Sequence, residues 1–379
     1  MRVVLLTHSY PRWPGDFAGA AQGALARALV RRGMSVRVVV PSEDSAGRAE
    51  LEGVVVDRVR VARAAAEALR DPDALATRLR RPLAWASLLR VWRSLRIAAR
   101  RQVAAGADVV HAHWWIPSGL ATPRGVPVVL TIHGADAGLL QRSRLARTLA
   151  QPLWRRTTLV TAVSPEVGDS VQILAGRSMP AEHIQPMPIE TKGLPWTRGG
   201  DGAVLLGRLD HQGRVELAIE TVAILASSGH AMPLTIVGDG PARRRLQQRA
   251  EQLGVSALVQ FAGSLPPDQA RSYLARADVL LFTSRSESNA GPALDALITG
   301  VPIVSCWDSG AVVGVVPQSG PGRLCLPTAD ALAESVVHLQ ADKDRLALSR
   351  LVGESWRARL APDHVAERCE SWYRDALAQ

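Results

Sequence analysis

The sequence predicts an α/β protein made of two doubly wound domains that face one another across a central cleft. First, short runs rich in β-branched residues alternate with Ala-, Leu- and Arg-rich stretches of helical period along the whole chain. Second, these runs are apolar almost without interruption, which is typical of parallel strands covered on both faces. Third, a stretch crowded with Pro and Gly, residues 185–202, interrupts the alternation and indicates an interdomain linker.

The expected strands follow in order along the chain. Six precede the linker, at residues 2–7, 35–40, 53–61, 107–113, 126–132 and 158–163. Five follow it, at residues 203–207, 233–238, 258–263, 278–283 and 301–305. We therefore expect two Rossmann-like domains, an N-terminal one over residues 1–190 and a C-terminal one over residues 200–360. The last helix, about residues 361–379, is expected to pack back on the first domain.

Composition excludes several classes of protein. The chain has 379 residues, 47% of them hydrophobic, which indicates a soluble globular protein large enough for two cores. No apolar run approaches the roughly 18 residues of a spanning helix, and the opening segment is too soon broken to be a secretory signal. The three cysteines of the chain, Cys306, Cys325 and Cys369, have neither the spacing of a metal site nor that of a disulfide framework. We expect a cytoplasmic protein, a monomer or a homodimer, without a metal site.

The net charge of +10 is carried almost entirely by arginine, since Lys192 and Lys343 are the two lysines of the chain. This bias is typical of a GC-rich genome, so we expect no nucleic-acid partner. Residues 78–101 combine an apolar stripe at roughly helical spacing with arginines between its members; the stripe comprises Leu88, Leu89, Trp92, Leu95 and Ile97. Such a helix either packs its apolar stripe on a sheet, the interpretation we favour, or lies peripherally on an anionic membrane at its inner face.

Polar residues follow the predicted strands at six places. In a doubly wound fold, ligands bind at the carboxyl ends of the strands, beside the free N–H groups of helix N-termini. The six turns are the loop 8–22 with Gly15 and Gly19, the pair Trp114 and Trp115, and the segments 133–136, 208–214, 239–241 and 286–295. Together they predict one binding crevice.

The stretch "SESNAGPALDALITGVPIVS", residues 286–305, shows what this crevice would bind. Gly291 and Pro292 are suited to open a helix, whose first amides and dipole would seat a phosphate. Glu287 lies before this helix and Asp295 one turn inside it, where each carboxylate would accept hydrogen bonds from hydroxyl groups. A diphosphate flanked by two polyols is a nucleotide sugar.

These segments, in this order, resemble the retaining GT-B glycosyltransferases of group 1, the family 4 type. "HSYPRWPGDFAGAAQ", "DVVHAHWW" and "LTIHGAD" are similar to parts of the first domain of that family. "LLGRLDHQGRVELAIETV", "LTIVGDGP" and the stretch from residue 286 are similar to parts of the second. The resemblance implies transfer of a sugar from a UDP- or GDP-sugar to an acceptor with retention of configuration and no further cofactor. The composition also favours a bacterial cell-envelope or natural-product glycoside.

The resemblance assigns roles residue by residue. The expected catalytic residues are His133, near the reacting sugar carbon, Glu287, near the sugar hydroxyls, and Arg208, on the diphosphate. Donor contacts are expected from Gly19, Arg208, Gln212, Arg214, Gly238, Ser264, Leu265, Glu287, Asn289, Ala290, Gly291, Pro292, Ala293 and Asp295. Acceptor contacts are expected from Asp16, Trp114, Trp115 and Asp136.

Two departures from the family pattern leave alternatives open. Gln212 stands where the family usually has a lysine, so a phosphate-binding charge is lost unless Arg214 replaces it. Asp295 stands where a glutamate is usual, and is shorter by one methylene. The alternatives are a GT-B nucleotide-sugar isomerase or phosphorylase, and a non-catalytic GT-B partner protein. Structural roles also compete for His133 and Asp295, and Asp136 is as well suited to cap a helix.

Overall fold

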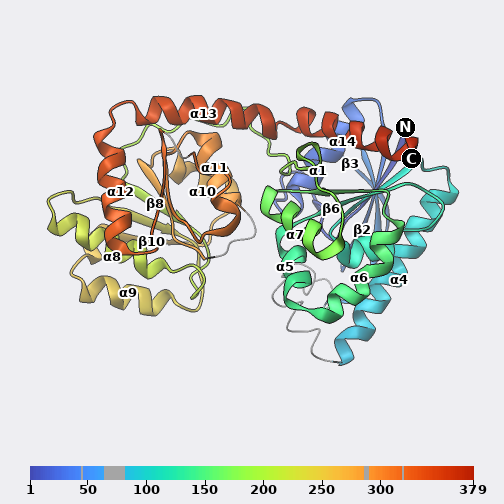
Figure 1. Ribbon diagram of the computed structural model, residues 1–379, viewed down its shortest axis with the longest axis horizontal. Helices are drawn as coiled ribbons and strands as arrows, with labels where there is room; N and C mark the ends of the chain where they lie inside the picture. Colours follow the sequence, from blue (N-terminus) through green and yellow to red (C-terminus); the bar gives the residue numbers. More distant parts are fainter. Residues whose placement is uncertain (44–45, 64–81, 286–289, 318–319) are drawn as a thin grey trace. The chain divides into compact units, whose positions relative to one another are not determined.

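The computed structural model describes residues 1–43, 46–63, 82–285, 290–317 and 320–379 (Figure 1). The described chain forms two compact units. Unit 1 comprises Met1–Glu190 and Leu360–Gln379, and unit 2 comprises Thr191–Arg359. Each is a sheet with helices on both faces, and the predicted α/β class with two doubly wound domains is confirmed.

The sheet of unit 1 has seven strands in the order β3-β4-β2-β1-β5-β6-β7. The strands are β1 (Arg2–Leu6), β2 (Ser35–Ser42), β3 (Gly47–Leu51), β4 (Val54–Arg60), β5 (Val109–His113), β6 (Val128–Ile132) and β7 (Leu159–Ala162). All neighbours are parallel except β3 and β4, which form an antiparallel hairpin at the edge. Strand β3 was not predicted, because its sequence "GRAEL" is polar and mostly exposed and lacks the apolar run of a covered strand.

Helices cover both faces of this sheet. They are α1 (Ala20–Arg31), α4 (Pro82–Ala104), η1 (Trp115–Gly119), α5 (Gly134–Arg142), α6 (Arg144–Arg156), α7 (Pro165–Ala175), η2 (Ala181–His183) and α14 (Pro362–Ala378). On one face α1 and α14 pack together, and on the other α4 to α7 surround a second apolar cluster. The C-terminal helix α14 buries Trp372 and Tyr373 in unit 1, and Trp372 Nε1 donates to the carbonyl of Glu182 at 2.9 Å.

The arginine-rich helix α4 packs on the sheet with one face only. Val91, Leu95 and Ala99 are buried against the strands. Leu89 and Ile97, which the sequence placed in the same apolar stripe, are instead 60% and 42% exposed. Among the described residues, no helix has the length and apolar character needed to cross a membrane.

The sheet of unit 2 has six parallel strands in the order β10-β9-β8-β11-β12-β13. They are β8 (Ala203–Leu206), β9 (Leu234–Val237), β10 (Val259–Gly263), β11 (Val279–Phe282), β12 (Ile303–Cys306) and β13 (Gly322–Cys325). The helical segments are α8 (Val215–Ser227), α9 (Arg243–Gln252), η3 (Ser256–Leu258), α10 (Pro267–Leu274), α11 (Gly291–Thr299), η4 (Gly310–Val312), α12 (Ala329–Ala341) and α13 (Arg345–Leu360). The edge strand β13 was not predicted as a strand, because it is short and only partly apolar.

The strand order places a topological switch point in each unit. In unit 2 the chain builds β8, β9 and β10 to one side and then crosses over to β11, β12 and β13. In unit 1 the corresponding reversal lies between β1 and β5. Ligands of doubly wound folds bind outside the carboxyl ends of the strands at such a point. Ligands are therefore expected at the loops after β8 and β11 in unit 2, and at those after β1 and β5 in unit 1.

Candidate active site

The loop after β8 is held in place by close backbone contacts. Gly238 follows β9 with φ +150°, and a Cβ atom there would overlap the carbonyl oxygen of Gly207. Glycine is therefore required for the two strand ends to lie this close. The role expected for Gly238 in donor binding is thus indirect in this structure, since its direct contact is with the loop that carries Arg208.

Arg208 projects from this loop with its side chain 68% exposed. Its Nε lies 3.3 Å from Oδ2 of Asp210, a weak pairing at an exposed site. Asp210 also shapes the turn, because its Oδ1 accepts from the N–H groups of Gln212 and Gly213 at 3.0 Å each. The Gln212 side chain is exposed and contacts the ring of His211 at 3.2 Å. Arg208 thus keeps its charge available at the switch point.

Arg214 has a partner that the sequence did not reveal. Its guanidinium forms a bidentate ion pair with the carboxylate of Asp308, with N···O distances of 2.8 and 2.7 Å. Its Nε also donates to the carbonyl of Thr283 at 2.8 Å. The hydrogen bonds from Arg214 lower the pKa of Asp308 below its usual value. Arg214 therefore ties the loop after β8 to those after β11 and β12, and its charge is already balanced by a carboxylate.

Helix α11 begins at Gly291, with Pro292 in its first turn and Ala290 as its N-cap residue. This helix start agrees with the one predicted from Gly291 and Pro292. Ala293, in the first turn of α11, is fully buried. Ser264 and Leu265 lie in the loop between β10 and α10. Glu287 and Asn289 fall outside the described residues, so their expected roles remain predictions.

Asp295 also has an unexpected partner. Its Oδ1 accepts from Nε of Arg271 in α10 at 2.9 Å, with the two side chains 20% and 17% exposed. Burial raises the pKa of Asp295, and the charge of Arg271 opposes that rise. One of the carboxylate oxygens expected to accept from a ribose diol is thus engaged by α10. A ribose would have to share Asp295 with Arg271.

In unit 1, three histidines gather at the switch point. His8 follows β1, His113 ends β5, and His133 follows β6. Nδ1 of His113 lies 3.3 Å from Nε2 of His133. The ring of Trp114, whose φ is +73°, lies 4.4 Å from that of His8 and 5.8 Å from that of His133. His113 is buried, whereas His8, Trp114 and His133 keep part of their surface exposed.

All three imidazoles are neutral near pH 7. Burial lowers the pKa of His8 to about 4. Burial and the neighbouring His8 lower the pKa of His113 to about 3. Burial, His113 and His8 together hold the pKa of His133 well below its usual range. His133 is therefore suited to hydrogen bonding or dipolar stabilisation, and not to acting as a cation.

Two residues expected to contact an acceptor are instead part of the fold. Trp115 and Asp136 are each 1% exposed. The Asp136 carboxylate accepts from the N–H groups of Trp115 at 2.9 Å and His133 at 2.8 Å, and the indole of Trp115 donates to the carbonyl of Asp136 at 2.9 Å. Asp136 thereby caps α5 and positions the backbone of His133, which favours the structural alternative.

The loop after β1 is internally tied in the same way. Asp16 is 4% exposed and forms an ion pair with Arg12 at 2.7 Å. Burial acts to raise the pKa of Asp16, but the hydrogen bonds from Arg12 and from the N–H of Ala18, with the charge of Arg12, outweigh it and lower the pKa. Gly19 has φ +74°, and a Cβ there would meet the backbone of Tyr10. Both residues thus shape this loop, while Trp114 is left as the expected acceptor residue with exposed surface.

Sequence reasoning missed five polar residues that the structure places at or behind these sites. They are His8, which lies in the predicted loop 8–22 but was given no role, and His113, Arg271, Asp308 and Tyr373. The pattern "HAH" at residues 111–113 was a usable signal, since residues two apart in a strand point to the same face of the sheet. The other partners are far apart in the sequence and carry no local signal.

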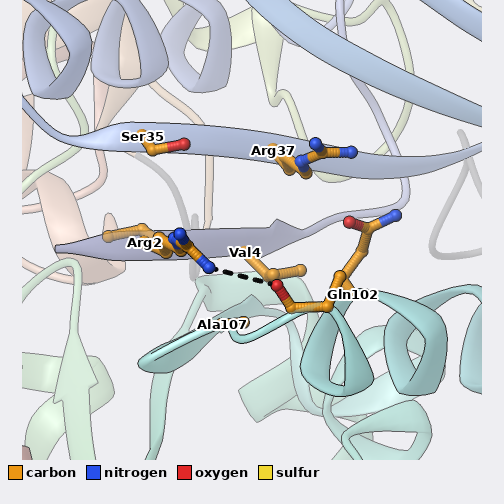
Figure 2. Close-up of a pocket in the computed structure, with 8 residues that line it drawn as sticks. Arg2, Val4, Ser35, Arg37, Gln102 and Ala107 are labelled. Atoms are coloured by element: carbon orange, nitrogen blue, oxygen red, sulfur yellow. Dashed lines mark hydrogen bonds between the residues drawn. The ribbon is translucent and has the colours of Figure 1, made fainter.

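Figure 2 shows a cavity of about 300 Å³ that lies elsewhere. It is lined by Arg2, Ser35 and Arg37, near the amino ends of β1 and β2, and by Gln102 of α4. Arg2 donates to the carbonyl of Ala105 at 3.3 Å. This is the edge of the sheet opposite to the ligand-binding loops. The cavity therefore does not coincide with the predicted site.

Two doubly wound units of this topology define the GT-B fold, and solved structures of that fold match the whole chain. Sucrose-phosphate synthase from Thermosynechococcus elongatus matches with a TM-score of 0.73 at 16% identity, over 100% of this chain and 99% of that one. Anabaena HepE, solved in complex with UDP, matches with a TM-score of 0.68 at 18% identity, over 99% and 100% of the two chains. At these identities the likeness shows the fold.

The family is shown by the sequence. Residues 197–350 match the model of the family "Glycosyl transferases group 1", and residues 23–188 match that of "Glycosyltransferase Family 4". The chain belongs to the group 1 glycosyltransferases, as its motifs predicted.

Two similar relatives illustrate the range of the family. A 2-deoxystreptamine glucosyltransferase of Streptomyces kanamyceticus is 27% identical over 66% of this chain and 73% of the relative. The putative teichuronic acid biosynthesis glycosyltransferase TuaC of Bacillus subtilis is 27% identical over 69% and 68% of the two chains. Natural-product and cell-envelope glycosyltransferases are thus both among its relatives.

Proposed function

We propose that this protein transfers a sugar from a nucleoside-diphosphate sugar, with UDP or GDP as the nucleotide, to an acceptor with retention of configuration. The observation that carries the proposal is the switch point of unit 2. There the exposed guanidinium of Arg208 and the N-terminus of α11 come from the two loops that this topology assigns to ligands. The family match and the UDP complex of the structural neighbour HepE support the choice of ligand.

In this proposal different loops of unit 2 contact different parts of the donor. Arg208 neutralises the diphosphate as the bond to the sugar breaks, because a preorganised cation is most effective where charge develops. The first turn of α11 binds the phosphates, and Glu287 accepts from sugar hydroxyls. Asp295 accepts from the ribose while Arg271 holds its carboxylate in place.

The Arg214–Asp308 ion pair argues against Arg214 as a simple replacement for the lysine that the family usually has at the position of Gln212. Because Asp308 already balances the charge of Arg214, we assign Arg214 first to holding the loop that presents Arg208, and only second to the phosphates. Gln212 remains exposed on the same loop, where a lysine would add charge.

His133 of unit 1 is proposed to act on the reacting sugar. As a neutral imidazole, it would accept or donate a hydrogen bond at the sugar without adding charge. Trp114 beside it offers an aromatic face on which an acceptor ring would stack.

A panel of nucleotide sugars tests the proposal. With an accepted donor, free nucleoside diphosphate should appear only when an acceptor is present, and NMR of the product should show the anomeric configuration of the donor. Isomerised nucleotide sugar, or turnover that requires inorganic phosphate, would favour the isomerase or phosphorylase. Failure to bind any nucleoside diphosphate in calorimetry would favour a non-catalytic partner protein.

We also propose that the outward face of α4 contacts anionic lipid. No Asp or Glu occurs between Asp73 and Asp108, and exposed Leu89 and Ile97 alternate with exposed arginines on this face. Arg93→Glu should reduce co-sedimentation with phosphatidylglycerol vesicles, whereas Arg244→Glu, the same charge change on α9, should not. Equal binding of wild type and Arg93→Glu would contradict this contact.

A further inference from the structure

A row of buried polar rings leads through unit 1 to His133. It begins in the C-terminal helix, where the Tyr373 hydroxyl lies 2.8 Å from Nδ1 of His111. The ring of His111 stacks on that of His113 with centroids 4.4 Å apart and 30° between the planes. Nδ1 of His113 in turn lies 3.3 Å from Nε2 of His133.

The first member of this row is firmly held. Both ring nitrogens of His111 have partners, Tyr373 on one side and Thr131 Oγ1 at 2.7 Å on the other. His111 and Tyr373 are both fully buried. Because β5 places His111 and His113 on one face of the sheet, the fixed ring of His111 forms one wall for the ring of His113.

The contact between His113 and His133 couples their protonation. Both rings are neutral, so each carries one proton, on either Nδ1 or Nε2. A hydrogen bond between Nδ1 of His113 and Nε2 of His133 requires a proton on one of these atoms and none on the other. The tautomers of His113 and His133 are therefore coupled, since each tautomer of one ring is compatible with one tautomer of the other.

Packing alone does not explain a histidine at position 113. Its Nε2 is buried and has no partner within the described parts of the chain. An apolar side chain would avoid the loss of free energy that accompanies an unsatisfied buried polar atom. The imidazole is therefore justified by what its Nδ1 does for His133.

We propose that His113 is a positioning residue that sets the ring orientation and the tautomer of His133. The proposal rests on the function given above, in which His133 acts on the reacting sugar. His113 itself is only 1% exposed, so in this proposal it does not touch the substrate. Its effect is to hold the ring of His133 in one orientation and one tautomer during transfer.

Two substitutions at position 113 separate positioning from packing. His113→Asn keeps a hydrogen-bonding group at the place of Nδ1, whereas His113→Gln moves its amide to the place of Nε2. The matched control is His183→Gln, because His183 also has a buried Nδ1 without a partner in the described chain but lies apart from the row. Circular dichroism confirms that each variant is folded.

Two readouts then decide. With ¹⁵N-labelled histidine, the His133 signals, assigned with His133→Asn, should report one tautomer in the wild type and in His113→Asn and a mixture in His113→Gln. For His113→Gln, kcat should fall on the order of 10²-fold, as expected for a misoriented group, with KM and nucleoside diphosphate affinity unchanged. The kcat of His113→Asn should stay within about tenfold of the wild-type value, and the kcat of the control His183→Gln should equal the wild-type value.

Equal losses in His113→Asn and His113→Gln, or an unchanged His133 tautomer in His113→Gln, would overturn the proposal. If no donor is turned over by the wild type, the proposed function fails. The tautomer measurement then still decides whether His113 positions His133.

Discussion

Removing the Arg214 side chain tests whether the ion pair with Asp308 supports the donor loop or binds phosphate. In Arg214→Ala, two hydrogen bonds to Asp308 and one to the carbonyl of Thr283 are lost, together with a long one of 3.5 Å to the carbonyl of Ser284. Asp308 is 38% exposed and can rehydrate, so we count about 1 kcal/mol for the ion pair. The carbonyl bond contributes about 1 kcal/mol more. The positive φ of Arg214 adds nothing to the difference, since alanine bears the same strain.

We therefore expect Arg214→Ala to lower the free energy of unfolding by about 2 kcal/mol, and the Tm by roughly 4–8 °C if unit 2 unfolds cooperatively. The pH dependence follows from Asp308, whose pKa is lowered by Arg214. An acid with a lowered pKa in the folded state stabilises it above its unfolded pKa, near 4, and ceases to do so as pH falls through the folded value. The difference between wild type and variant should thus be full at pH 7 and shrink below about pH 4.

Calorimetry with UDP, GDP and the free nucleosides completes the test. If Arg214 mainly holds the loop, Arg214→Ala and Asp308→Asn should weaken nucleoside diphosphate binding to a similar extent, and the double variant should be no worse than either. If Arg214 binds phosphate directly, Arg214→Ala should weaken diphosphate binding much more than nucleoside binding, and adding Gln212→Lys should partly restore it. No change in stability and no change in binding would refute both roles.

Two further predictions concern the donor. Arg208→Ala should reduce turnover by roughly 10²–10⁴-fold, because it removes a cation from the point where charge develops; steady-state kinetics within a few-fold of wild type would remove Arg208 from the site. Asp295→Asn should weaken nucleoside diphosphate binding by on the order of 1–3 kcal/mol, whereas Glu287→Gln should leave that affinity nearly unchanged and reduce kcat, since its bonds go to the sugar. Equal losses of nucleotide affinity in these two variants, measured by calorimetry, would contradict the division of roles.

The motifs predicted most of the fold because strands buried on both faces must be apolar along their whole length. Where that condition fails, the prediction failed too. Strand β3 is an exposed edge and was not recognised, and α4 turns Leu89 and Ile97 outward although their spacing resembles that of its buried residues. Burial depends on what packs against a helix, and helical spacing alone does not reveal it.

The sequence by itself determined the two-domain α/β fold, the family, and the loops in which Arg208, the start of α11 and His133 lie. These depend on local patterns, namely apolar runs and the residues that end strands and begin helices. The tertiary structure alone decided which charges and rings pair. Asp308 is 94 residues from Arg214, and Tyr373 is 262 residues from His111. The first pair forms because strand order brings two distant loops to the same edge of a sheet, and the second because α14 packs against β5, so the chain carries no local trace of either. For the same reason the structure, and not the motif, buried Trp115 and Asp136 and placed His113 behind His133.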